Sequence, residues 1–186
     1  YKGIGFLMMK EFKYLSNVST NKDTKIIVIL GGSKVSSKLA MIRYFLDKSD
    51  YILIGGAMAF TFLKSMGYNV GNSLVEDDMI DEAQYIINKS KELNVSIELP
   101  KDIWCSKEFS EDKRKLTKLQ DIESDDIGLD IGQETIALYS SILNNADTII
   151  WNGPMGAFEL KKYSIGTKQI AKHIAELTNT NDICSV

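Results

Sequence analysis

The stretch "KIIVILGGSKVSSK" at residues 25–38 decides the fold, because an apolar strand ends there in two glycines. A nearly continuous apolar run is typical of a strand that is covered on both faces of a parallel sheet. Gly31 and Gly32 have no Cβ atom, so a ligand can approach the backbone closely at the end of this strand. We expect Lys34 and Lys38 to lie one turn apart at the start of the next helix, a favourable position for phosphate groups.

Strands and helices alternate along the rest of the chain, which predicts a doubly wound, Rossmann-like three-layer α/β fold with a parallel sheet and helices on both faces. The expected strands span residues 25–30, 51–54, 95–100, 147–152 and 182–186, and the expected helices span residues 6–15, 36–48, 57–66, 76–93, 134–143 and 166–177. The charged segment 101–126 is expected to be irregular. In such sheets a ligand binds beyond the carboxyl ends of the strands. Because three strands end in glycine loops, we expect one binding rim there.

Composition narrows the possible functions. The 186 residues carry a net charge of −3, so the chain has no general attraction to nucleic acid or to an anionic membrane. No apolar run reaches the roughly 18 residues of a membrane span. Cys105 and Cys184 have no metal-ligand spacing, which favours two free thiols in a reducing compartment. We therefore expect a cytoplasmic protein.

The segment "WNGPMGAFE" at residues 151–159 is the most specific motif. Asn152 can donate to phosphate oxygens, the glycines and Pro154 form a rigid loop that can lie against a base, and Glu159 can accept hydrogen bonds from both ribose hydroxyls. The alternative is a tight turn with a surface glutamate. Trp151 is expected to belong to the core rather than to stack on a ligand.

Other patterns point away from competing activities. The P-loop pattern does not occur, and the dinucleotide fingerprint is missing because the second strand ends in Gly55-Gly56 rather than in an acid. A dinucleotide-dependent dehydrogenase is therefore disfavoured. His173 is expected at the surface or half-buried rather than as a general base. In "SDDIGLD", Gly128 can line a pocket, whereas Asp125 and Asp126 are expected to form a turn.

Taken together, "VILGGSKVSSK", "LIGGAMAFTFLKSMGYNVGNSL", "LPKDIW", "GLDIG" and "WNGPMGAFE" resemble phosphoglycerate kinase, in the order and with the spacing of that family. The resemblance covers essentially the whole chain. It implies the C-terminal, nucleotide-binding domain of a glycolytic enzyme that transfers the acyl phosphate of 1,3-bisphosphoglycerate to Mg-ADP, reversibly, giving 3-phosphoglycerate and ATP. Phosphoryl transfer needs positioning and charge neutralisation more than a nucleophile or base, and no such group is visible.

The resemblance also implies a role for individual residues. Lys34 would stabilise charge on the transferring phosphoryl group, and Lys38 and Asn152 would hold the nucleotide phosphates. Gly32, Gly55, Gly56 and Gly128 would line the adenosine pocket; Pro154, Gly156 and Ala157 would border the base, and Glu159 would bind the ribose. No metal ligand is assigned within the chain.

The sequence departs from the family pattern at several points. Ser33 and Ser37 replace the usual Ala and Asp of the first motif, and the loss of the Asp leaves the orientation of Lys38 open. The family's glycine-rich loop, with its Mg²⁺-binding aspartate, is expected after "DICSV", where the chain stops, and the N-terminal domain that binds 3-phosphoglycerate is also expected outside it. Residues 1–20 are predicted to be an interdomain helix and linker, and residues 21–186 a nucleotide-binding domain that lacks its C-terminal end.

Two functions remain open from the sequence. The first is the nucleotide-binding half of phosphoglycerate kinase, which would act as a monomer with ADP/ATP and Mg²⁺ and would be inactive as this fragment alone. The alternative is a non-catalytic nucleotide-binding or interaction module derived from the same domain. Both share every motif above.

Overall fold

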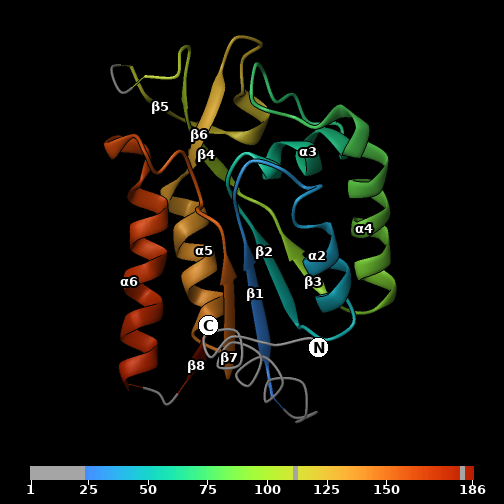
Figure 1. Cartoon of the computed structure of the whole chain (residues 1–186). Helices are drawn as coiled ribbons and strands as arrows, with labels where there is room; N and C mark the ends of the chain where they lie inside the picture. Colours follow the sequence, from blue (N-terminus) through green and yellow to red (C-terminus); the bar gives the residue numbers. More distant parts are fainter. Residues whose placement is uncertain (1–23, 111–112, 181–182) are drawn as a thin grey trace, which may run out of the picture.

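The computed structural model describes residues 24–110, 113–180 and 183–186. Its centre is a five-stranded sheet in which every neighbouring pair is parallel, with the order β3-β2-β1-β7-β8 (Figure 1). The strands are β1 (Ile26–Leu30), β2 (Tyr51–Ile54), β3 (Ser96–Glu98), β7 (Thr148–Asn152) and β8 (Cys184–Ser185). The predicted α/β fold class is therefore confirmed.

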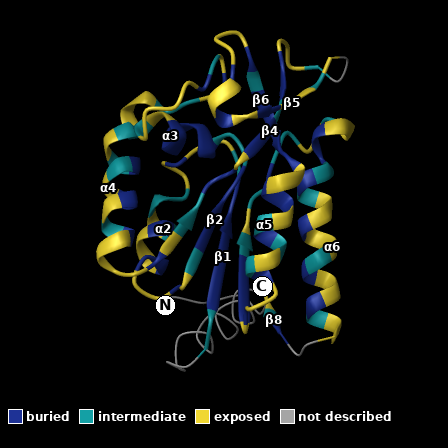
Figure 2. Cartoon of the chain, turned by 180° about the vertical axis from the view of Figure 1, so that it is seen from behind, coloured by how far each residue is buried: buried dark blue, intermediate teal, exposed yellow. Residues whose placement is uncertain are grey.

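Helices cover both faces of this sheet, and β1 shows why (Figure 1). All five residues of β1 are buried. Since successive side chains point to opposite faces of the sheet, this requires that both faces are covered. Val28 belongs to the core cluster on one face, and Ile27 and Ile29 belong to the cluster on the other. The first face is covered by α2 (Leu39–Phe45), α3 (Met58–Ser65) and α4 (Ile80–Glu92), and the second by α5 (Gln133–Leu143) and α6 (Ile165–Thr180). Figure 2 shows the buried strands between exposed outer helix faces.

The strand order reverses between β1 and β7. From β1 the chain moves outward in one direction through β2 and β3, and later continues from β7 to β8 on the other side. Parallel α/β sheets bind ligands at the carboxyl ends of the strands beside such a reversal. The glycine loops that follow β1 and β7 meet at this point, as the sequence predicted.

The expectation of an irregular segment at 101–126 is wrong. A second, antiparallel sheet with the order β5-β4-β6 is formed by β4 (Asp102–Ser106), β5 (Lys115–Lys118) and β6 (Ile127–Ile131). Only Thr117 of the four residues of β5 is buried, and both ends of the strand are lysines, so this edge strand has no apolar pattern to reveal it. Gly128 therefore lies on this second sheet and not at the end of a parallel strand.

The first helix after β1 also differs from its prediction. We expected it to begin near Ser36, but α2 begins at Leu39 and ends at Phe45. Residues 36–38 form a turn instead, in which the Lys38 N–H donates to the Val35 carbonyl oxygen at 2.9 Å. Lys34 is therefore outside the helix, and the two lysines do not share a helical face.

Short 3₁₀ helices lie at η1 (Asp77–Met79), η2 (Leu119–Asp121) and η3 (Lys161–Tyr163).

The helix expected at residues 6–15, and with it the proposed interdomain segment 1–20, lies outside the described residues. Within the described part of the chain, none of the helices has the length and apolar character needed to cross a membrane.

Candidate functional site

A cavity of about 500 Å³ opens at the carboxyl ends of the central strands. Its lining comes from the loops after β1, β2 and β7, together with β6 and two loop residues. Seven predicted site residues line it: Gly32, Gly56, Gly128, Pro154, Gly156, Ala157 and Glu159. The other lining residues are Ser33, Ala57, Leu74, Phe109, Ile127, Leu129 and Phe158. The structure thus brings most of the predicted nucleotide contacts together in one cleft.

The loop after β7 packs directly on the glycines after β1 and β2. The Gly32 N–H donates to the Pro154 carbonyl oxygen at 2.9 Å, and the Gly56 N–H donates to the Met155 carbonyl oxygen at 2.9 Å. A Cβ atom on Gly31 would lie 2.1 Å from the Pro154 carbonyl oxygen, so only glycine fits there. Glycine at this position therefore lets the loop after β7 pack closely on the end of β1.

Gly128 is placed by a different close contact. A Cβ atom on Gly128 would lie 2.0 Å from the ring of Phe60, a buried residue of α3. The Gly128 N–H donates to the Ser73 hydroxyl at 2.9 Å. Because Gly128 has no side chain, β6 can pack directly on Phe60 of α3 and form one wall of the cavity.

Four predicted residues do not line the cavity. Gly55 packs against Met155, since a Cβ atom there would lie 2.6 Å from the Met155 sulfur. Lys34, Lys38 and Asn152 are the others. Lys38 Nζ donates to the Asn152 Oδ1, so the two predicted phosphate ligands meet at the ends of β1 and β7. Lys34 makes no side-chain hydrogen bond or ion pair with the other described residues.

The loop that carries both lysines is held by Glu76, which the sequence analysis did not single out. Its carboxylate accepts the Ser36 N–H at 3.0 Å and the Ser36 hydroxyl at 2.6 Å. Burial acts to raise the pKa of Glu76, but the hydrogen bonds from Ser36 and the charge of Lys34 outweigh it, so the pKa lies below its usual value. The Ser36 N–H, at the position where we expected the helix to begin, therefore donates to a carboxylate of the chain itself.

Glu76→Ala is expected to lower the free energy of unfolding by about 1 kcal/mol, because two hydrogen bonds to a half-buried carboxylate are lost. Urea denaturation at pH 7 measures this difference. Ser36→Ala removes only the hydroxyl bond and keeps the backbone bond, so its effect should be smaller. Equal stability of Glu76→Ala and the parent chain would show that Glu76 does not hold the loop.

Three large apolar side chains that line the cavity were not singled out by the sequence analysis. Leu74, Phe109 and Phe158 have exposed fractions of 53%, 57% and 60%. Exposed apolar side chains that gather around a cavity mark a binding surface for an apolar group. They lie in loops, where periodicity carries no information, although Leu74 and Phe158 belong to motifs that were recognised.

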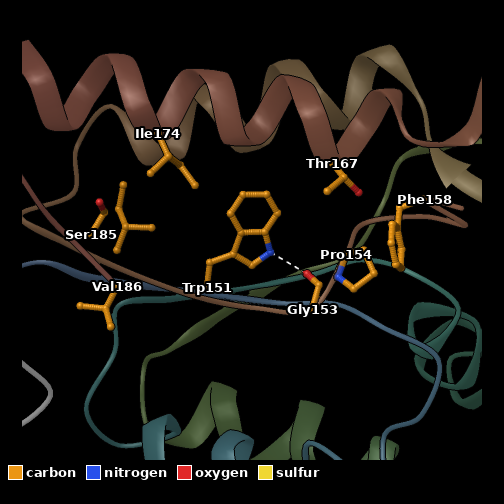
Figure 3. A pocket seen from close by; sticks show the side chains of 9 residues that line it. Trp151, Gly153, Pro154, Phe158, Thr167, Ile174, Ser185 and Val186 are labelled. Carbon is orange, nitrogen blue, oxygen red and sulfur yellow. Dashed lines mark hydrogen bonds between the residues drawn. The ribbon is translucent and has the colours of Figure 1, made fainter. Parts of the chain in front are cut away.

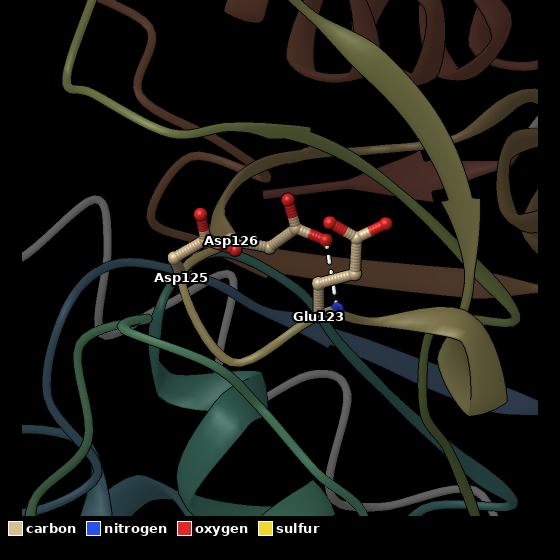
Figure 4. A group of neighbouring side chains, drawn as sticks. All are labelled: Glu123, Asp125 and Asp126. Atoms are coloured by element: carbon tan, nitrogen blue, oxygen red, sulfur yellow. Dashed lines mark hydrogen bonds between the residues drawn. The ribbon is translucent and has the colours of Figure 1, made fainter.

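Three carboxylates gather just before the cavity-lining Ile127 (Figure 4). Glu123, Asp125 and Asp126 place carboxylate oxygens within 4.8 Å of one another. The Lys107 ammonium binds all three, at 2.6 Å from Glu123 and 3.0 Å from Asp126. Hydrogen bonds from Lys107 and Lys115 lower the pKa of Glu123 to about 2. These ion pairs thus connect Lys107, two residues before Phe109, to the predicted turn at 125–126. The negative charge of the three carboxylates is paired with lysine.

A second hollow of about 480 Å³ lies on the other side of the loop after β7. Figure 3 shows Trp151 in it, facing Ile174 of α6, with its indole N–H donating to the Gly153 carbonyl oxygen at 2.6 Å. Trp151 packs against the core cluster on the α5 and α6 face, as predicted. Pro154 and Phe158 line both hollows, so this loop separates them.

Three further expectations concern single residues. Both cysteines are free, and burial raises the pKa of the Cys105 thiol to about 11, which keeps it protonated. His173 is half-buried, with its Nε2 atom 3.1 Å from the Ser140 carbonyl oxygen. Neither His173 nor the cysteines line the cavity.

These features define the chain as a three-layer α/β domain with a glycine-lined cleft where the strand order reverses. The family model for phosphoglycerate kinase matches residues 1–186. The chain belongs to the phosphoglycerate kinase family.

Curated and solved relatives agree with this assignment. The chain is 49% identical over 177 residues to the phosphoglycerate kinase of Thermosipho africanus and 48% identical over 176 residues to that of Nautilia profundicola, covering 94% of this chain and 44% of each relative. The structure of phosphoglycerate kinase from Coxiella burnetii is similar with a TM-score of 0.88 and 39% identity, over 92% of this chain and 45% of that one. The chain therefore spans less than half the length of the relatives that it matches.

Proposed function

We propose that this chain forms the ADP/ATP-binding domain of a phosphoglycerate kinase, which transfers a phosphoryl group reversibly between 1,3-bisphosphoglycerate and ADP. One observation carries the proposal: the cavity at the reversal of strand order is lined by seven of the residues that the resemblance assigns to the nucleotide. Its apolar wall suits a flat base, and Glu159 at its edge suits the ribose hydroxyls. The substrate with the acyl phosphate would bind to another domain of the complete kinase.

The phosphates would extend from this cavity toward Lys38 and Asn152, which already contact each other. Lys34 would meet the transferring phosphoryl group, since its ammonium makes no hydrogen bond or ion pair with the other described residues. Mg²⁺ would come with the nucleotide and neutralise phosphate charge. We assign no residue of this chain to the ion.

Calorimetric titration with ADP, in the presence and absence of Mg²⁺, tests the binding role. We expect one saturable site and competition by adenosine, because the base and ribose would occupy the cavity. Absence of saturable ADP binding would refute the proposal.

A coupled assay of ATP formation from 1,3-bisphosphoglycerate and ADP tests the kinase role. The complete kinase should turn over, and this chain alone should not, because the acyl-phosphate site is assigned to the other domain. Turnover by the chain alone would contradict that division of labour. Saturable ADP binding without any turnover in the complete protein would instead favour the non-catalytic module.

Lys38→Ala in the complete kinase is expected to raise the KM for ADP about tenfold, equivalent to about 1.4 kcal/mol, with little change in kcat. Its ammonium lies beside Asn152, where it would bind phosphates that do not move during transfer. Such uniform binding is shared by the ground state and the transition state, so its loss appears in KM. Steady-state kinetics with ADP varied at saturating acyl phosphate measure the change. A lower kcat with an unaltered KM would contradict the assignment.

A further inference from the structure

Asp130 is a buried carboxylate beside the cavity, and the proposed mechanism gives it no role. It lies on β6, directly after the cavity-lining Leu129, and is only 3% exposed. Its Oδ2 accepts the Gly166 N–H at 2.8 Å, in the first turn of α6, and its Oδ1 accepts the Ile131 N–H at 3.0 Å. The carboxylate thus connects the second sheet to the start of a helix on the central sheet.

Two glycines enclose this carboxylate from opposite segments. A Cβ atom on Gly156, in the cavity loop, would lie 2.3 Å from the Asp130 Oδ1, and a Cβ atom on Gly166 would lie 2.5 Å from the same atom. Burial raises the pKa of the Asp130 carboxyl group to about 7, although the N–H groups of Gly166 and Ile131 and the charge of Arg114 act in the opposite direction. The fold therefore keeps a carboxyl group buried at this junction, although burial of a charged group is unfavourable in free energy.

The cavity loop is bound to both elements that Asp130 connects. The Met155 N–H donates to the Thr167 hydroxyl of α6 at 2.9 Å, and the Ala157 N–H donates to the Leu129 carbonyl oxygen of β6 at 2.7 Å. Gly156 lies between these two bonds and against the carboxylate. Any change in the distance between β6 and α6 must therefore be taken up by residues 155–157, which include two lining residues of the cavity.

We propose that Asp130 is a positioning residue for the nucleotide cavity: by fixing the start of α6 against β6, it holds residues 155–157 in the geometry that receives the base. The identity of the ligand rests on the proposed function, whereas the positioning of the loop does not. Asp130 touches no substrate in this account and acts only through the loop.

The chain contains a matched control for this role. Asp102 on β4 is also buried, and its carboxylate accepts the N–H groups of Glu134 and Thr135 at the start of α5, at 3.1 and 2.8 Å. A Cβ atom on Gly132 would lie 2.1 Å from the Asp102 Oδ2. Asp102 and Gly132 thus repeat the arrangement of Asp130 and Gly166 at a different helix, and neither lines the cavity.

The experiment compares these two pairs in the purified protein. Asp130→Asn places an amide N–H₂ against one of two backbone donors, and Gly166→Ala pushes on the carboxylate from the α6 side without touching the cavity. Both variants should weaken ADP binding about 3- to 10-fold in calorimetry and speed the amide hydrogen exchange of residues 155–157 about tenfold. Asp102→Asn and Gly132→Ala should lower stability in urea, leaving ADP affinity within twofold and exchange at 155–157 unchanged.

The outcomes distinguish the positioning role of Asp130 from the proposed binding of ADP. Unaltered exchange at 155–157 in Asp130→Asn and Gly166→Ala would overturn the positioning role, whatever ADP does. Equal weakening of ADP binding by the Asp102 and Asp130 pairs would also overturn it, since the effect would then be general destabilisation. Faster exchange at 155–157 in a protein that does not bind ADP would support the positioning role and refute the proposed ligand. If either Asp130→Asn or Gly166→Ala does not fold, the other variant tests the positioning role.

Discussion

Lys34→Ala in the complete kinase is expected to lower kcat about 100-fold or more while changing the KM for ADP little. Lys34 directly follows Ser33, a lining residue of the cavity, and its ammonium has no hydrogen-bond or ion-pair partner among the described residues. A positioned charge donor that acts only on developing charge stabilises the transition state, and removing one such donor typically costs 10²–10³ in kcat. Steady-state kinetics with ADP varied at saturating acyl phosphate measure both constants.

The contrast with Lys38 makes this prediction specific. Lys38 is already hydrogen-bonded to Asn152, so it should serve binding. Lys34, whose ammonium makes no hydrogen bond or ion pair in the described part of the chain, should serve transfer. Lys172→Ala, on the exposed surface of α6, removes the same charge and should change neither constant. If Lys34→Ala raised KM and left kcat intact, the roles of the two lysines would be interchanged. If neither lysine mattered, "GGSKVSSK" would be an ordinary strand-to-helix turn.

The central sheet could be predicted because its physical signals are local. Strands such as β1 are buried on both faces and therefore read as continuous apolar runs, and the glycines at their ends mark the rim at which the cavity opens. The antiparallel sheet gave no such signal. Only Thr117 in β5 is buried, and β4 pairs with strands on both sides through contacts that no local pattern encodes.

The same distinction applies to the site. Residues of recognised motifs were found together in the cavity, such as Gly32, Gly128 and Glu159. Glu76 was missed because its partner Ser36 lies 40 residues away in sequence, and nothing in an acidic helix start distinguishes an anchor from a solvated carboxylate. Asp130 was missed as a single residue for a related reason, since its burial depends on two glycines from distant segments.

Glu159→Ala is expected to weaken ADP binding by roughly 1.5–3 kcal/mol, the usual contribution of hydrogen bonds to a charged group. Glu159 is exposed at the edge of the cavity, on the same loop as Pro154 and Gly156, so its carboxylate is free to accept both ribose hydroxyls. Calorimetric titration measures the loss. Glu176→Ala, on the exposed surface of α6, removes the same charge and should leave the affinity unaltered.

The nucleotide can be changed as well as the protein, which isolates the contact with the ribose. The parent chain should bind 2′,3′-dideoxy-ADP more weakly than ADP. The factor should be about the same as that by which Glu159→Ala weakens the binding of ADP, because either change removes the same hydrogen bonds. Glu159→Ala should then hardly distinguish the two nucleotides, since a double-mutant cycle attributes the non-additive part to the direct interaction. Equal discrimination by the parent and the variant would show that Glu159 affects the cavity by another route, and would leave the ribose without an assigned partner in this loop.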